Sequence, residues 1–220
     1  MNCEESPIDL VFVLDSSGSI RDQNVDGQPD NYDLMLQFMA NIVDDLDIGA
    51  AATQVGLVRF SDRGELLFRL GEYNTKQALR EQILATSYVG SNTNTSGGLY
   101  VMYTEAFNAA NGDRPGFPNV AVVITDGFST FDNDTTIPNA VIARNRGIQI
   151  FSVGITNNIN LNELRQMSSQ PQLENVNYFV SENFATLDEQ VRPALIDQTC
   201  TVDGSQYTLR HSSFYRCVVS

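Results

Sequence analysis

Three oxygen-bearing side chains at alternate positions follow the first apolar run of the chain: Asp15, Ser17 and Ser19. Carboxylate and hydroxyl oxygens are ligands that suit Mg²⁺, but this cation prefers about six oxygens and keeps some of them as water. Two later segments can supply more, because a Ser-Asn-Thr-Asn-Thr loop at 91–95 leads into a helical pattern and Asp126 follows the apolar run 120–125. Each pattern alone is common in capped turns. Together, and in this order, they predict a divalent-cation site.

This combination of segments resembles the von Willebrand factor type A domain over roughly residues 7–197. In that family the three segments form a metal-ion-dependent adhesion site, and an acidic side chain of a partner protein completes the shell of the cation. The resemblance implies five ligands in this sequence: Asp15, Ser17, Ser19, Thr93 and Asp126. Thr93 is chosen over Thr95 because the family uses the first threonine of its Thr-x-Thr. Mg²⁺ is the expected cation, with Mn²⁺ and Ca²⁺ as alternatives.

Alternating strand and helix patterns place these segments in an α/β fold. We predict a doubly wound, mostly parallel six-stranded sheet with helices on both faces. The strands are expected at 8–14, 54–60, 66–70, 119–125, 148–155 and 177–181. The run 66–70 follows its predecessor after five residues, too few for a crossover helix, so we expect it to be an antiparallel edge strand.

Helices are expected at 32–46, 75–86, 95–110, 138–146, 160–169 and 183–197, with Pro193 interrupting or tightening the last of them. In open α/β sheets, ligands bind outside the carboxyl ends of the strands, where the strand order reverses. Asp15 and Asp126 each follow the carboxyl end of a predicted strand, so both are expected at that edge. Thr93 is expected to join them from a loop that enters a helix.

The charge and composition of the chain favour a binding module over an enzyme. With 27 acidic and 13 basic residues the net charge is −14, which argues against nucleic acid and anionic membranes as partners. No apolar run is long enough for membrane insertion. The one histidine, His211, lies in the tail, so no Ser/His/Asp or Cys/His relay fits the domain. An aspartyl-phosphate phosphatase needs a second aspartate where Ser17 stands, and we therefore expect no enzymatic activity.

Two cysteines bracket the predicted domain, because Cys3 precedes the first strand and Cys200 follows the last helix. In a doubly wound sheet both positions fall at the same pole, and we expect a disulfide between them. Closing so long a loop stabilises by up to about 5 kcal/mol in the chain-entropy model, and a disulfide implies an oxidising compartment. The glycosylation sequon at Asn133 agrees with secretion, whereas a glycan on the sequon at Asn94 would crowd the metal. We expect a secreted protein of the extracellular matrix.

An acidic segment after the first strand has part of the ligand pattern of an EF-hand calcium loop. Its oxygen-bearing side chains are Asp22, Asn24, Asp26, Asp30 and Asp33. Gly27 stands at the sixth position as the pattern requires, but Pro29 occupies the eighth, Asp33 replaces the bidentate glutamate, and no helix precedes the loop. Two interpretations stay open: a solvated acidic insertion, or a second calcium site beside the adhesion face.

The tail, 198–220, resembles the first half of a peritrophin-type chitin-binding module. It contains Cys-x-x-Asp-Gly from Cys200 and Phe-Tyr-x-Cys ending at Cys217, but His211 occupies the place of the usual second cysteine. A chance match in an unstructured tail is the alternative. A type A domain followed by chitin-binding modules resembles mollusc shell-matrix proteins of the Pif type, which link chitin to calcium carbonate.

The expected function is therefore that of a metal-ion-dependent binding module in an acidic biomineral matrix. Its expected partners are the acidic side chain of an extracellular matrix protein, calcium carbonate mineral and chitin. The alternative is a type A domain of soft connective tissue that binds collagen or another matrix protein. The acidic insertion and the tail favour the first interpretation.

Overall fold

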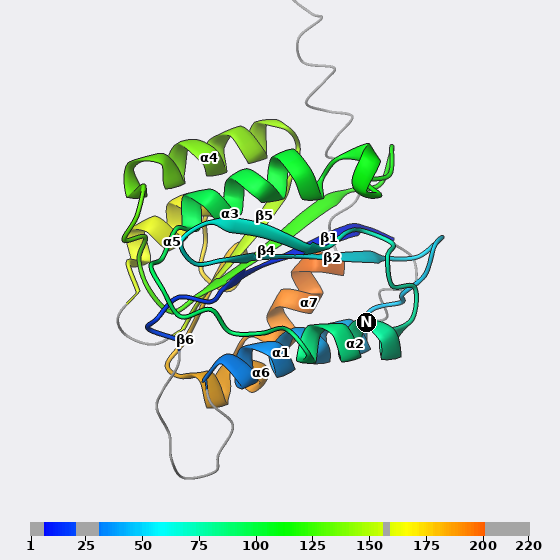
Figure 1. Cartoon of the computed structure of the whole chain (residues 1–220), viewed down its shortest axis with the longest axis horizontal. Helices are drawn as coiled ribbons and strands as arrows, with labels where there is room; N and C mark the ends of the chain where they lie inside the picture. The colour runs from blue at the N-terminus through cyan, green and yellow to red at the C-terminus, as the bar shows by residue number, and fades with distance from the viewer. Residues whose placement is uncertain (1–6, 21–30, 156–158, 201–220) are drawn as a thin grey trace, which may run out of the picture.

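The computed structural model describes residues 7–20, 31–155 and 159–200 as a six-stranded sheet with helices on both faces (Figure 1). The strands are β1 (Asp9–Asp15), β2 (Gln54–Phe60), β3 (Gly64–Phe68), β4 (Asn119–Thr125), β5 (Gln149–Ile155) and β6 (Tyr178–Ser181). Their order in the sheet is β3-β2-β1-β4-β5-β6, with β3 antiparallel to β2 and the other neighbours parallel. The predicted doubly wound α/β fold with one antiparallel edge strand is confirmed.

Helices of one group cover the first face of the sheet: α1 (Asn31–Asp45), α2 (Lys76–Leu84), α6 (Leu187–Gln190) and α7 (Arg192–Cys200). Those of the second group cover the opposite face: α3 (Thr95–Val101), α4 (Asn133–Asn145) and α5 (Leu161–Met167). Figure 1 shows α3 and α4 on one side of the strands and α1 and α2 on the other. Each face of the sheet therefore has its own hydrophobic core.

Strand β1 contributes to both cores, because successive side chains in a strand point to opposite faces. Phe12 and Leu14 pack in the core beneath α1, whereas Val11 and Val13 pack in the core beneath α3. All seven residues of β1 are buried. This double burial explains why the sequence of β1 is a continuous apolar run and does not alternate.

The edge strand lies two residues earlier than the predicted run 66–70, since β3 begins at Gly64 directly opposite Phe60. A Cβ atom at Gly64 would lie 2.2 Å from the carbonyl oxygen of Gly97 in α3. Only glycine permits such a close approach of two backbones. The close packing of β3 against α3 thus places the start of this strand at a residue with weak strand propensity.

Three predicted helices differ from the observed ones. In place of one helix at 95–110, the α-helical part α3 ends at Val101. A π-helical segment over Met102–Ala106 and a 3₁₀ turn over Ala109–Asn111 follow it. The helix predicted at 138–146 begins at Asn133, with Pro138 inside α4. The segment 183–197 forms a 3₁₀ turn (Phe184–Thr186), α6 and α7. Pro193 lies in the first turn of α7, where its missing N–H costs no helical hydrogen bond.

The carboxyl ends of β1 and β4 meet at the point where the strand order reverses. From β1 the chain moves outward to β2 and β3, and it returns to the other side of β1 with β4. Asp15 is the last residue of β1, and Asp126 directly follows Thr125, the last residue of β4. Both carboxylates therefore lie at the topological switch point, as predicted.

Candidate metal site

Three loops meet at the switch point and bring all five predicted ligands together. In the loop after β1, the Ser17 N–H donates to Asp15 Oδ1 at 2.8 Å, and the hydroxyls of Ser17 and Ser19 lie 3.2 Å apart. Ser19 Oγ donates to Asp126 Oδ1 at 2.8 Å, which joins this loop to the one after β4. Thr93 comes from the loop before α3, and with Ser19 and Asp126 it lines a pocket of about 260 Å³.

Hydrogen bonds between protein groups fix the loop after β1. The Gly18 N–H donates to the carbonyl oxygen of Ser91 at 2.7 Å, so the first loop is tied to the loop that carries Thr93. The Tyr88 hydroxyl donates to the carbonyl oxygen of Ser17 at 2.9 Å. The position of the Asp-x-Ser-x-Ser segment is thus set by the fold itself.

The two carboxylates of this cluster are removed from water, since Asp15 is fully buried and Asp126 is 5% exposed. Burial raises the pKa of Asp15 to about 7, against the hydrogen bonds from Thr125 and Ser17, and the nearby Asp126 adds to the rise. Burial also raises the pKa of Asp126, although its hydrogen bond with Ser19 acts in the opposite direction. A positive charge between the two groups would favour their ionised forms. The donor set, two carboxylates and three hydroxyls, fits a hard divalent cation.

Thr125 orients Asp15 and was missed by the sequence analysis. Its Oγ1 donates to Asp15 Oδ2 at 2.6 Å and accepts from the N–H of Gly127 at 3.2 Å. The sequence signal is a hydroxyl residue at the very end of an apolar strand, directly before a predicted ligand. The sequence alone does not distinguish this residue from an ordinary β-branched strand residue, because threonine is common in strands.

A family model described as the von Willebrand factor type A domain matches residues 9–193, a range that contains all five predicted ligands. The chain belongs to this family. Matrilin-1 from Gallus gallus is 34% identical to the chain over 182 residues, which make up 83% of this chain and 34% of the matrilin. Matrilin-1 from Homo sapiens is 35% identical over 185 residues, or 84% of this chain and 34% of the matrilin. The chain thus spans about a third of the length of these curated relatives.

Solved structures show the same fold. Proximal thread matrix protein 1 from the mussel byssus has a TM-score of 0.81 at 23% identity, over 90% of this chain and 49% of that chain. Another structure of this mussel protein, with a zinc-occupied MIDAS motif, has a TM-score of 0.77 at 26% identity, over 90% and 47%. The manganese-loaded TRAP protein from Plasmodium vivax has a TM-score of 0.66 at 16% identity, over 86% and 74%.

This type A domain is a secreted extracellular matrix protein, in agreement with its similarity to the matrilins and to the matrix protein of the mussel byssus. This confirms the predicted location. Across residues 7–20, 31–155 and 159–200, no helix combines the length and the apolar character needed to cross a membrane.

Several predicted features lie outside the described residues. Four members of the candidate second calcium site belong to 21–30: Asp22, Asn24, Asp26 and Asp30. The fifth, Asp33, is exposed in the first turn of α1. Cys3 also lies outside, and the side chain of Cys200 at the end of α7 is not described. The second calcium site, the disulfide and the chitin-binding tail therefore stay predictions, and the domain bounds of 7–197 stay a prediction as well.

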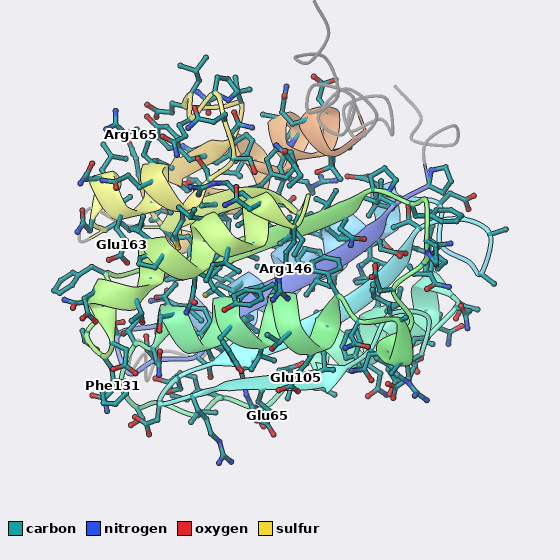
Figure 2. The ribbon with its side chains drawn as sticks, turned by 90° about the horizontal axis from the view of Figure 1, so that it is seen from above. Glu65, Glu105, Phe131, Arg146, Glu163 and Arg165 are labelled. Atoms are coloured by element: carbon teal, nitrogen blue, oxygen red, sulfur yellow. The ribbon has the colours of Figure 1, made fainter. Side chains whose placement is uncertain are left out.

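Thr130 fixes the position of Thr93 in this type A domain. The Thr93 N–H donates to Thr130 Oγ1 at 3.0 Å, and the Thr93 carbonyl oxygen accepts from the N–H groups of Thr130 at 2.9 Å and Phe131 at 3.2 Å. Helix α5 holds this loop in turn, because Glu163 accepts from the N–H of Ser129 at 3.0 Å and from its hydroxyl at 2.8 Å. Figure 2 shows Phe131 and Glu163 at the same end of the molecule. Contacts thus run from α5 through the β4–α4 loop to a candidate ligand.

Replacing Thr130 with valine is expected to weaken divalent-cation affinity about two- to tenfold, because a lost hydrogen bond costs about 0.5–1.5 kcal/mol. The matched control Thr130→Ser keeps the acceptor oxygen for the Thr93 N–H and should bind like the wild type. Isothermal titration with Mn²⁺ measures both affinities, and thermal unfolding checks that both variants are folded. Equal affinities of the valine and serine variants would contradict the positioning role of Thr130.

Proposed function

We propose that this type A domain is a metal-ion-dependent binding module of the extracellular matrix without enzymatic activity. The observation that carries the proposal is the pair of buried carboxylates, Asp15 and Asp126, which are joined through Ser19 at the switch point of the sheet. Ser17 and Thr93 supply the other hydroxyl oxygens of the cluster. Mg²⁺ is the proposed cation, with Mn²⁺ and Ca²⁺ as alternatives. Zinc and manganese in structures of similar proteins support a divalent cation.

The residues around the cluster are arranged to hold ligand oxygens in fixed positions. Thr125 orients the Asp15 side chain, Ser19 orients the Asp126 side chain, and Thr130 fixes the backbone of Thr93, so little conformational freedom is left to lose on binding. When bound, the cation supplies a positive charge that attracts the carboxylate of a partner.

The pocket beside these oxygens is the proposed entry for the partner. Thr93 and Asp126 line it together with Asn31, Phe128 and Phe184. The Phe128 side chain is 52% exposed, so an apolar surface borders the polar cluster. We propose that the acidic side chain of an extracellular matrix protein enters here and completes the shell of the cation.

The finer proposal is an acidic biomineral matrix of the Pif type. The net charge of −14, the acidic segment 22–33 and the likeness of the tail to a chitin-binding module support calcium carbonate and chitin as partners. Similarity to the matrilins supports the alternative, in which the domain binds collagen or another protein of soft connective tissue. Both alternatives use the same metal site.

Adsorption to calcium carbonate separates the two alternatives. The wild-type domain is expected to adsorb to calcite more strongly than a neutral protein of the same size and than an acidic control protein. Diffuse charge attraction is screened within about 8–10 Å at ordinary ionic strength, so moderate salt would remove a protein bound only in this way. Direct coordination by the site or the acidic segment predicts binding that resists salt.

Two variants identify which part of the domain binds the mineral. Asp15→Ala tests the metal site, and the combined variant with Asp22→Asn, Asp26→Asn and Asp30→Asn tests the acidic segment. Each is expected to reduce the salt-resistant fraction. Wild-type adsorption no stronger than that of the acidic control would contradict the mineral proposal. Retention of collagen or another matrix protein in Mg²⁺ would then favour soft connective tissue.

A further inference from the structure

The sequence contains two N-glycosylation sequons, Asn94-Thr95-Ser96 and Asn133-Asp134-Thr135. Both lie close in sequence to the metal site, because Asn94 follows Thr93 and Asn133 begins α4 after the loop that starts at Asp126. The structure places the two asparagines in opposite environments. This contrast allows an inference about which one is modified.

Asn94 is buried, with 6% of its surface exposed, and its side chain forms the N-cap of α3. Its Oδ1 accepts from the N–H of Gly97 at 2.7 Å, and its Nδ2 donates to the carbonyl oxygen of Asp62 at 2.9 Å. A glycan attached to Nδ2 would have to occupy the space between Asn94 and Asp62. A chain glycosylated at Asn94 is therefore unable to keep the contact of Nδ2 with Asp62 and the packing around this buried side chain.

Asn133 is exposed in the first turn of α4, within the exposed stretch 130–135. A branched oligosaccharide at this position extends into solvent without displacing any buried group. Thr135 of the sequon lies with its Oγ1 2.8 Å from Ser96 Oγ and 2.8 Å from the carbonyl oxygen of Asp132. N-glycosylation modifies the chain before it folds, so these later contacts of Thr135 do not compete with the reaction.

We propose that the folded, secreted chain carries an N-linked oligosaccharide on Asn133 and none on Asn94, because a chain modified at Asn94 cannot pack as the structure requires. The donor is a polyprenyl-diphosphate-linked oligosaccharide of the secretory pathway, which a secreted protein encounters. Asn133 Nδ2 bonds to the anomeric carbon of the first sugar and loses a proton. The bond from that carbon to the diphosphate oxygen breaks, and the diphosphate leaves with the electron pair.

The glycan has a consequence for the metal site, and this part rests on the proposed function. The Phe131 N–H contacts the carbonyl oxygen of Thr93 at 3.2 Å, and Asn133 is only two residues further along the chain. From the reach of two residues, the Asn133 Cα lies within about 12 Å of that oxygen. The oligosaccharide thus borders the metal site on the α4 side and supplies no ligand to the cation.

The test uses the full chain secreted from eukaryotic cells. Peptide mapping after treatment with peptide-N-glycosidase F in ¹⁸O water is expected to label Asn133 and leave Asn94 unlabelled. Asn133→Gln should remove the whole glycan mass, whereas the matched control Thr135→Ser keeps the sequon and should retain it. An unmodified Asn133, or a folded chain that carries the glycan on Asn94, would overturn the proposal.

Mn²⁺ titration of the protein before and after enzymatic removal of the glycan tests its place beside the metal site. Equal affinities are expected, and a change of about tenfold or more would overturn the placement of the glycan outside the shell of the cation. Absence of Mn²⁺ binding in both samples would contradict the proposed function. The glycan occupancy measured by peptide mapping would still stand, so the two failures are distinguishable.

Discussion

Replacing Asp15 with alanine or asparagine is expected to lower divalent-cation affinity by at least about 100-fold, because even groups that only support a metal ligand cost about 10–100-fold when they are removed. Asp15 is one of only two carboxylates among the five proposed ligands, so the substitution also halves their negative charge. Asp126→Ala should have the same effect. Thr93→Ala removes one neutral oxygen and is expected to be milder. Isothermal titration with Mg²⁺ or Mn²⁺ measures each affinity.

The domain should remain folded in the Asp15 variants, since no Arg or Lys pairs with Asp15 within the described residues. In Asp15→Asn, Oδ1 still accepts from the Ser17 N–H, and the cost of ionising a buried carboxyl disappears. Asp47→Asn is the matched control: it makes the same chemical change at an exposed residue beyond the far end of α1. An affinity of Asp15→Asn within about threefold of the Asp47→Asn value, well short of the loss expected for a lost ligand, would contradict the site.

The sequence predicts the parts of the fold that depend on local patterns. Strand β1 is recognisable because burial on both faces requires a continuous apolar run, and the predicted ligands lie in the segments that follow such runs or precede a helical pattern. The ends of elements follow from contacts that are distant in sequence. The start of β3 at Gly64 depends on the backbone of Gly97, and α4 begins five residues before the predicted start at Pro138.

Sequence patterns also fail to identify the groups that orient the ligands, because these contacts again join residues that are distant in sequence. The hydrogen bond from Thr125 to Asp15 spans 110 residues, and that between Thr93 and Thr130 spans 37. Each of these threonines is a plausible strand or loop residue when it is considered alone. Only the parallel pairing of β1 with β4 brings Thr125 beside Asp15. The ligands can thus be predicted from a sequence pattern, whereas the threonines that orient them can be identified only from the structure.

The raised pKa of Asp15 has two opposite effects on pH dependence. Without a cation, the unfolded chain releases this proton near the usual pKa of 3.8, whereas the folded domain keeps it up to about pH 7. The unfolded state therefore binds fewer protons between these values, and the stability of the cation-free domain falls as the pH rises through this window. The raised pKa of Asp126 acts in the same direction. Above about pH 7 the part of this loss that comes from Asp15 is complete.

Cation affinity is expected to change in the opposite sense, because a metal ligand must be deprotonated. With the pKa of Asp15 at about 7, the cation must displace a proton at lower pH. Affinity should then fall about tenfold per pH unit below 7, or about 100-fold between pH 8 and pH 5. Titration of Mn²⁺ at several pH values, in buffers of different ionisation enthalpy, measures both the affinity and the proton released. Thr93→Ala should show the same slope at weaker affinity, and an affinity that is unchanged between pH 7 and pH 5 would contradict a cation bound to Asp15.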